Sequence, residues 1–131
     1  MRQSKRLICE NKYFSDKVEV VPIPGKGLGI IAKQDFNKNE LVEAAPIIEI
    51  PEKDNNLCAW TIFGKYWFSL TDQICCIGLG YTSIYNHANK PNASFYSADK
   101  VLLIKAIKKI KKGEEITVDY QWGKKDTKNF I

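Results

Sequence analysis

Residues 17–32 read KVEVVPIPGKGLGIIA, and this stretch decides the fold class of the chain. Residues 17–21 alternate charged and β-branched side chains, a pattern typical of a half-buried strand. The strand is expected to end at residues 22–25, because the prolines there remove backbone donors and the glycine favours a turn. The apolar run at residues 30–32 then predicts a second short strand.

Further short segments of β character follow along the chain. Residues 60–62 and 66–69 are interpreted as a hairpin, and residues 72–77 as a loop or a single helical turn. Residues 78–92 are irregular for longer than most connections, which makes them a candidate functional loop. The remaining predicted strands are residues 41–43, 46–50, 93–96, 101–106 and 115–120. Many short strands without repeats or heptads indicate a mostly β domain.

Length and charge limit the classes of function. The chain has 131 residues, 44% of them apolar, which suffices for one globular domain with its own core. We expect a surface segment at residues 1–16, the domain at 17–122 and a short tail at 123–131. No apolar run or signal-peptide pattern points to a membrane, so an intracellular protein is expected, in the cytoplasm or the nucleus. The net charge of +5 favours an acidic partner.

The cysteines do not form a recognisable metal motif. They show no C-x-x-C spacing, and an adjacent pair is poorly suited to one tetrahedral zinc ion. Reduced, buried thiols are the simpler expectation for an intracellular protein. The four residues are Cys9, Cys58, Cys75 and Cys76.

Three segments carry candidate chemistry, although each also has a plain structural explanation. Residues 25–29, GKGLG, fit neither a Walker loop nor a dinucleotide fingerprint, because no helix follows them. Residues 85–92, YNHANKPN, hold the only histidine of the chain, His87, which has no neighbouring ligands at metal spacing. Residues 113–120, GEEITVDY, read as a turn that enters a strand ending in Tyr120.

In order and spacing, these three segments resemble the SET-domain protein lysine methyltransferases. That family has a G-x-G near its start, an N-H-x-x-x-P-N segment, and a G-E-E-I-x-x-D-Y segment near its end. The resemblance covers roughly residues 17–122 and is greatest to short stand-alone members of bacteria and large DNA viruses. It implies a SET-domain fold of small curled β-sheets, of the β-clip type, in which the C-terminal segment threads beneath a loop to form a pseudoknot.

The resemblance also implies a binding site for S-adenosylmethionine, with S-adenosylhomocysteine as the product. The backbone of Lys26, Gly27 and Leu28 would lie against this cofactor. The side chain of Asn86 would take its amino-acid end, and the main chain of His87 would pair with its adenine.

Tyr120 matches the active-site tyrosine of the family and is the predicted catalytic residue, also in contact with the cofactor. Trp122 is placed where an aromatic ring could pack on the adenine or close the lysine channel. Only a neutral lysine can accept a methyl group, and deprotonating a free lysine at pH ~7.4 costs about 4 kcal/mol. An apolar channel would lower this cost, because desolvation disfavours the ammonium. Phe95 and Val118 are the predicted channel residues, and since neither carries a hydroxyl, more than one methylation is expected.

The chain departs from the family at several positions. Many eukaryotic members bind zinc through a cysteine where this sequence has Asn89, and no cysteine follows Cys76, so no zinc is expected. Ala88 and Ser83 stand where the family often has serine and arginine. The short tail implies that another element, such as a second copy in a homodimer, completes the substrate channel.

The predicted function is therefore methyl transfer to a lysine of a histone tail or another basic protein. No membrane partner is expected, and nucleic acid only indirectly. Two alternatives stay open: a catalytically weak SET-fold module that binds a peptide or chromatin partner, and a basic β domain that binds nucleic acid. The substrate protein and its target lysine are not specified by the sequence.

Overall fold

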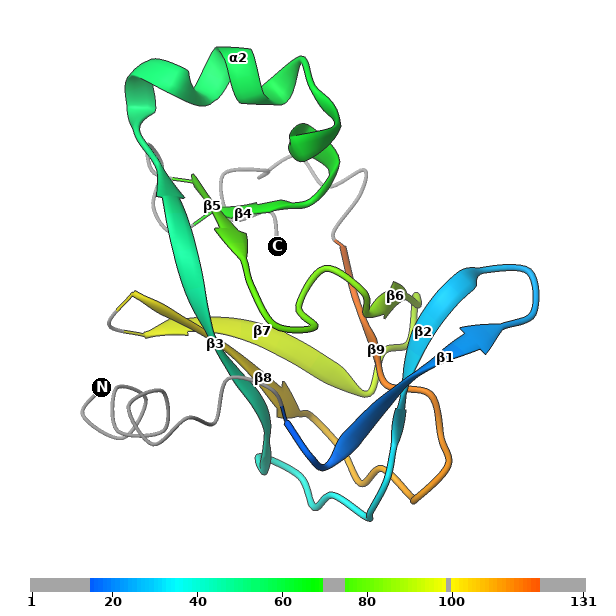
Figure 1. Cartoon of the computed structure of the whole chain (residues 1–131). Helices are drawn as coiled ribbons and strands as arrows, with labels where there is room; N and C mark the ends of the chain where they lie inside the picture. Colours follow the sequence, from blue (N-terminus) through cyan, green and yellow to red (C-terminus); the bar gives the residue numbers. More distant parts are fainter. Residues whose placement is uncertain (1–14, 70–74, 99, 121–131) are drawn as a thin grey trace.

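The structure is a computed structural model that describes residues 15–69, 75–98 and 100–120. It is mostly β, as predicted, and its sheets are small and curled, as the resemblance implies (Figure 1). The helical elements are short: η1 (Glu52–Asp54), α2 (Asn55–Ala59) and η2 (Ile62–Lys65). The strands are β1 (Val18–Ile23), β2 (Gly27–Ala32), β3 (Leu41–Ile50), β4 (Trp67–Ser69), β5 (Cys75–Gly78), β6 (Asn86–His87), β7 (Ala93–Ala98), β8 (Val101–Ala106) and β9 (Thr117–Val118).

These strands form one larger sheet and two small ones. The larger sheet has the order β4-β5-β3-β8-β7, and its neighbouring strands are all antiparallel. β1 and β2 form a separate antiparallel ribbon, whereas β6 and β9 form a short parallel pair. Figure 1 shows β3 crossing the molecule between the α2 end and the β1–β2 ribbon. The β6–β9 pair places residues 86–87 beside residues 117–118, which are far apart in sequence.

The β1–β2 ribbon confirms the two strands expected at the start of the domain and lengthens both of them. Gly25 and Gly27 have φ angles of 78° and 82°, which glycine adopts without steric cost. The N–H of Lys26 donates to the carbonyl of Ile23 at 3.0 Å and closes the turn. Pro22 is tolerated inside β1 because one edge of a two-stranded ribbon needs no backbone partner.

Two strand predictions are joined in the structure. Residues 41–43 and 46–50 form the single strand β3, which pairs with β8 along its first part and with β5 along its last part. A register shift between Leu41 and Glu43 marks an irregularity near its start. The carbonyl of Pro46 still accepts a hydrogen bond, from Leu79 N–H at 3.0 Å, because proline lacks only the donor.

The predicted hairpin at residues 60–62 and 66–69 is wrong. Residues 55–59 and 62–65 are helical, and the remaining strand, β4, pairs with β5. The apolar run has no clear period, so its sequence does not show which part forms a strand. In the structure, β4 forms by pairing with β5, with Phe68 opposite Cys76. The predicted loop at 72–77 falls partly outside the described residues, and β5 begins at Cys75. The last predicted strand, 115–120, is regular only at Thr117–Val118.

The main core lies between the sheets and places the C-terminal segment. Ile30, Ile104, Ile116 and Val118 are fully buried in it. Burying each such side chain stabilises the fold by about 1.5–3 kcal/mol. The N–H of Ile116 also donates to the carbonyl of Ile30 at 2.8 Å, so the chain approaching β9 runs beside β2.

Several predictions fall outside the described residues. They concern residues 1–14 of the surface segment, the tail at 123–131, Cys9 and Trp122. The parallel pairing of Asn86 with Thr117 places the C-terminal strand beside the N-H segment, while the pseudoknot stays a prediction. Within the described ranges, no helix has the length and apolar character needed to cross a membrane.

Candidate active site

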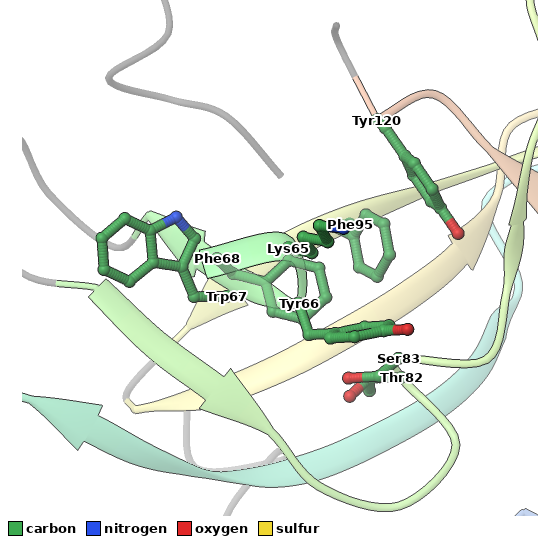
Figure 2. Close-up of a pocket in the computed structure, with 8 residues that line it drawn as sticks. All are labelled: Lys65, Tyr66, Trp67, Phe68, Thr82, Ser83, Phe95 and Tyr120. Carbon is green, nitrogen blue, oxygen red and sulfur yellow. The ribbon is translucent and has the colours of Figure 1, made fainter. Parts of the chain in front are cut away.

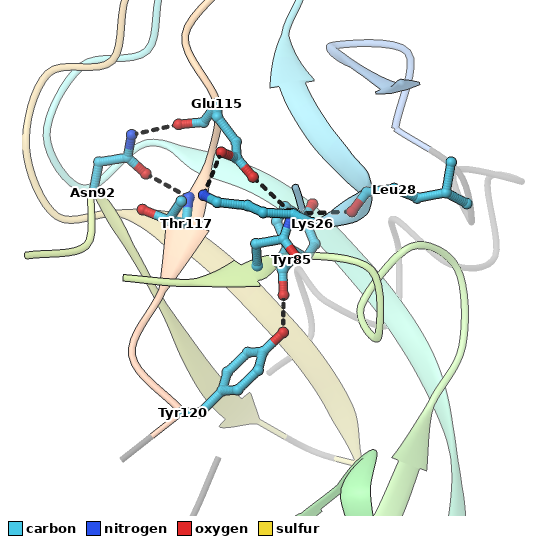
Figure 3. A network of polar contacts seen from close by, with 8 residues as sticks. Lys26, Leu28, Tyr85, Asn92, Glu115, Thr117 and Tyr120 are labelled. Atoms are coloured by element: carbon cyan, nitrogen blue, oxygen red, sulfur yellow. Dashed lines mark hydrogen bonds and ion pairs between the residues drawn. The ribbon is translucent and has the colours of Figure 1, made fainter. Parts of the chain in front are cut away.

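A polar network joins the three motif segments (Figure 3). Lys26 Nζ lies 2.9 Å from Glu115 Oε1, and Asn86 Nδ2 donates to Glu115 Oε2 at 2.8 Å. Asn86 Nδ2 also contacts the Leu28 carbonyl at 3.0 Å. The glycine ribbon, the N-H segment and the G-E-E segment thus meet at the carboxylate of Glu115.

Gly29 allows this close approach. A Cβ at this position would overlap the side chain of Ile23 and lie 2.8 Å from Asn86 Nδ2 and 2.9 Å from Glu115 Oε2. Real Cβ atoms do not approach other atoms so closely, so a side chain here would force Ile23, Asn86 and Glu115 to shift. The second glycine of the ribbon has the opposite surroundings, since a Cβ on Gly27 would meet nothing within 4 Å.

Asn92, the last residue of the N-H-x-x-x-P-N segment, binds the C-terminal segment through its side chain. Its Nδ2 donates to the Glu115 carbonyl at 2.9 Å, and its Oδ1 accepts from the Thr117 N–H at 2.9 Å. The side chain is buried, so both ends of its amide have the partners that burial demands. Asn92 therefore sets the position of Glu115 and of β9.

His87 holds the residues that follow β9. Its Nδ1 accepts a hydrogen bond from the backbone N–H of Tyr120 at 2.9 Å and lies 3.7 Å from Asp119 Oδ1. The centroids of the His87 and Tyr120 rings are 5.3 Å apart. The sequence predicted a role for the His87 main chain; the structure shows its imidazole as a structural acceptor.

The Tyr120 hydroxyl donates to the main-chain carbonyl of Tyr85 (Figure 3). Burial raises the pKa of Tyr120 above its usual value, and the nearby Tyr66 and Glu115 raise it further. The phenol is therefore protonated at neutral pH and acts as a hydrogen-bond donor. Since Tyr85 directly precedes Asn86, this bond brings the predicted catalytic residue next to the polar network.

An open cavity lies beside the Tyr120 ring, and its empty space of about 370 Å³ includes a part that is open solvent (Figure 2). Most of its wall is aromatic. Phe68, Phe95 and Thr82 form its buried part, and the two phenylalanine ring centroids are 4.6 Å apart. Figure 2 shows the hydroxyls of Tyr66 and Tyr120 pointing toward the same side. The lining residues are Lys65, Tyr66, Trp67, Phe68, Thr82, Ser83, Phe95 and Tyr120.

The structure separates the two predicted channel residues. Phe95 lines the cavity. Val118 is fully buried in the main core and is not among the lining residues. β9 ends at Val118, so Tyr120 lies beyond the regular strand, and its ring reaches the cavity while the Val118 side chain stays in the core.

Sequence reasoning missed several residues of this site. Glu115 stood in a quoted motif, but nothing local indicated that it would contact Lys26, which is 89 residues away. Tyr66 and Phe68 belonged to a recognised aromatic stretch that was assigned to a hairpin. Tyr85 and Glu43 gave no signal, because their hydrogen bond joins residues 42 positions apart.

The residues around Glu115 fit the amino-acid end of a cofactor such as S-adenosylmethionine. Lys26 and Asn86 supply donors, whereas the Leu28 carbonyl and the Glu115 carboxylate supply acceptors. A ligand that carries both an ammonium and a carboxylate matches such a mixed set. The open backbone at Gly27 leaves room for it.

The described residues contain no group of three or more His, Cys, Asp or Glu side chains that could hold a metal ion. Cys58 and Cys76 are free thiols; Cys76 is buried as expected, whereas Cys58 and Cys75 are only partly buried. Burial raises the pKa of Cys76 to about 12, so this thiol is neutral. The expectation that the chain binds no zinc stays a prediction.

Comparisons with known proteins agree with this geometry. Residues 27–121 match a family model described as the SET domain. The crystal structure of a Plasmodium falciparum protein named "putative histone methyltransferase" is similar, with a TM-score of 0.67 and 26% sequence identity. The match covers 82% of this chain and 97% of that one. A search of curated proteins finds no significant match.

Proposed function

The chain belongs to the SET-domain family, and from this premise we propose that it is an S-adenosylmethionine-dependent protein-lysine N-methyltransferase. One observation carries the proposal. Tyr120 lines the aromatic cavity and donates its hydroxyl hydrogen to the residue next to Asn86. A single phenol therefore lies between a cavity suited to a long side chain and a polar network suited to an amino acid.

The cavity supports the lysine half of this proposal. A lysine attacks through the lone pair of its neutral amine, so the site must favour loss of the ammonium proton. Phe68 and Phe95 offer walls without hydrogen-bond partners, and desolvation between them lowers the pKa of an inserted lysine. Tyr66 and Tyr120 retain hydroxyls that can orient the amine at the cavity wall. Enforced proximity then removes much of the remaining barrier.

Tyr120 is assigned a positioning and electrostatic role within the reaction, rather than that of a base. Its raised pKa keeps the phenol protonated, so it cannot accept a proton from a lysine ammonium at neutral pH. The proton therefore leaves to solvent before the attack. What Tyr120 supplies is a fixed hydroxyl dipole at the junction of cavity and network, in a site from which water is partly excluded.

The polar network supports the cofactor half. Lys26 would bind the carboxylate of the cofactor, and Glu115 with the Leu28 carbonyl would bind its ammonium. When bound, the cofactor supplies an electrophilic methyl group on a sulfonium. Because Asn86 belongs to both the network and β6, its amide would orient that end of the ligand.

The proposed substrate is a lysine in a histone tail or another basic protein. The name of the Plasmodium falciparum neighbour favours histones. The proposal includes completion of the channel by another element, such as a second copy of the chain. Trp122 stays a predicted contact to the adenine or the lysine channel.

A methylation assay tests the function directly. The protein is incubated with cofactor labelled in its methyl group and with core histones or a lysate of source cells, and labelled sites are mapped by mass spectrometry. We expect label on lysine side chains. Saturable cofactor binding without any transfer would favour the binding-module alternative. Salt-sensitive DNA binding without cofactor binding would favour the nucleic-acid alternative.

A further inference from the structure

Glu43 is a buried acid that the reaction described above does not use. It lies on β3 with only 2% of its surface exposed. Its Oε1 accepts the Tyr85 hydroxyl at 2.7 Å, and its Oε2 accepts the Tyr81 N–H at 2.8 Å. A buried carboxyl is costly unless it is hydrogen-bonded, so this pair of contacts indicates a defined task.

The contacts of Glu43 attach the turn before β6 to the large sheet. Two hydrogen bonds within the turn are local: Thr82 Oγ1 donates to the Leu79 carbonyl at 2.9 Å, and Ile84 N–H donates to the Tyr81 carbonyl at 2.9 Å. These two bonds shape the turn, and Leu79 N–H, which donates to the Pro46 carbonyl at 3.0 Å, holds its first residue to β3. Glu43 reaches it from 38 and 42 residues away. The carboxylate therefore links the position of the turn to that of β3.

Tyr85 transmits this position to the proposed active site. Its ring is 1% exposed and packs in the main core, with its hydroxyl held by Glu43. Its own main-chain carbonyl accepts the Tyr120 hydroxyl. One residue thus has its side chain fixed from β3 while its backbone orients the phenol beside the cavity.

We propose that Glu43 and Tyr85 are positioning residues that set the direction of the Tyr120 hydroxyl. This inference rests on the proposed methyltransferase function. Neither residue lines the cavity, so neither is expected to touch the substrate. Their effect passes through the Tyr85 carbonyl, since moving this acceptor redirects the phenol that it holds.

The ionisation of the pair agrees with a persistent contact. Burial raises the pKa of Glu43 to about 7, and burial beside Glu43 raises that of Tyr85 well above its usual value. The phenol can donate to the carboxylate or accept from the carboxylic acid. The link between β3 and the turn therefore does not require one charge state of Glu43.

The first test compares Tyr85→Phe with the wild-type protein. The substitution keeps the ring and the carbonyl but removes the bond to Glu43. We expect kcat to fall by about tenfold to a hundredfold, with KM for cofactor and peptide changed less than about threefold. In a Tyr120→Phe background, Tyr85→Phe should have no further effect on kcat, because the hydroxyl it positions is gone.

A second pair of variants keeps the test decisive if Tyr85→Phe does not fold. Glu43→Gln can still accept from the Tyr81 N–H and donate to the Tyr85 oxygen, so we expect kcat near wild type. Glu43→Asp is one methylene too short to keep both contacts, so kcat should fall. The ¹³C resonance of the Tyr85 carbonyl, read without cofactor, should move in Tyr120→Phe and in Glu43→Asp but not in Glu43→Gln.

The controls separate this inference from stability and from the proposed function. Val101→Ala creates a void in a different core cluster and should lower the melting temperature while kcat per folded molecule is unchanged. The inference is overturned if Tyr85→Phe and Glu43→Asp keep wild-type kcat, or if they lower it only as much as the folded fraction falls. Absence of transfer by the wild type would instead overturn the proposed function.

Discussion

The backbone N–H of Tyr120 donates a hydrogen bond to Nδ1 of His87 at 2.9 Å, so the histidine side chain anchors the residue that faces the cavity. A backbone N–H can only donate, and therefore Nδ1 is an acceptor and does not carry the ring proton. The proton belongs on Nε2, which lies 3.0 Å from Asn89 Oδ1. In this tautomer, the imidazole links the N-H segment to the chain after β9 through hydrogen bonds.

His87→Ala should remove this link to Tyr120. The Tyr120 N–H loses its acceptor, at an expected cost of about 0.5–1.5 kcal/mol in the free energy of unfolding, and kcat falls because the phenol is less well placed. His87→Asn offers an amide oxygen near the Nδ1 position and should recover part of both losses. Chemical denaturation and methyl-transfer kinetics check this. Equal kcat and stability for the alanine variant and the wild type would contradict this anchoring role of His87.

Tyr120→Phe should reduce methyl transfer strongly while leaving cofactor binding largely intact. The protonated phenol is a fixed dipole at the junction of cavity and network, and losing one such preorganised group costs about 10²–10³-fold in kcat. Calorimetric titration of the cofactor and transfer kinetics separate the two effects. Tyr96→Phe, which removes an exposed hydroxyl on β7, serves as the matched control. A Tyr120→Phe variant with wild-type turnover would refute the assignment.

Gly29→Ala should disturb the polar network. The new methyl group would overlap Ile23 and crowd the side chains of Asn86 and Glu115, costing about 1–3 kcal/mol in stability and weakening cofactor binding. Gly25→Ala is the control, because it strains a positive φ without meeting any atom within 4 Å. It should lower stability but keep cofactor affinity. Similar cofactor affinities for the two variants would argue against the crowding.

Stability should depend on pH through Glu43. Its pKa rises from 4.5 to about 7 on folding, so the folded chain binds more protons than the unfolded chain between these values. The stabilising effect of the protonated form is complete below pH 4.5 and is lost as the pH rises through 7. Relative to Glu43→Gln, the wild type should lose about 3 kcal/mol across this window. Urea titrations at several pH values measure it, and parallel stability curves would exclude this linkage.

Phe95→Tyr should change the number of methyl groups transferred. Phe95 lines the cavity, so a hydroxyl there would occupy space near the substrate amine and shift the product from higher methylation toward monomethyl-lysine. Val118→Thr tests the other sequence-predicted channel position, which the structure places in the core. It should destabilise the fold by about 1–3 kcal/mol without changing the product. Mass spectrometry of the product decides, and a monomethyl product from the wild type would contradict the predicted multiple methylation.

Much of the ribbon and the motif set could be predicted from sequence because the causes are local. Gly25 and Gly27 occupy positive φ angles that few other residues tolerate, and alternating β-branched residues mark β1. The same local logic failed for residues 60–62, where apolar side chains without a clear period fit a helix and a strand equally well.

Motif order alone assigned the chain to the SET-domain family and named Asn86 and Tyr120, since these segments carry their own residue identities. Tertiary structure alone brought Glu115 to Lys26 and Asn86, attached Tyr85 to Glu43, and sent Phe95 to the cavity but Val118 to the core. The physical reason is range: backbone angles and alternation are set by neighbouring residues, whereas these polar contacts join positions 29 to 89 residues apart. Their partners are chosen only when the sheets pack.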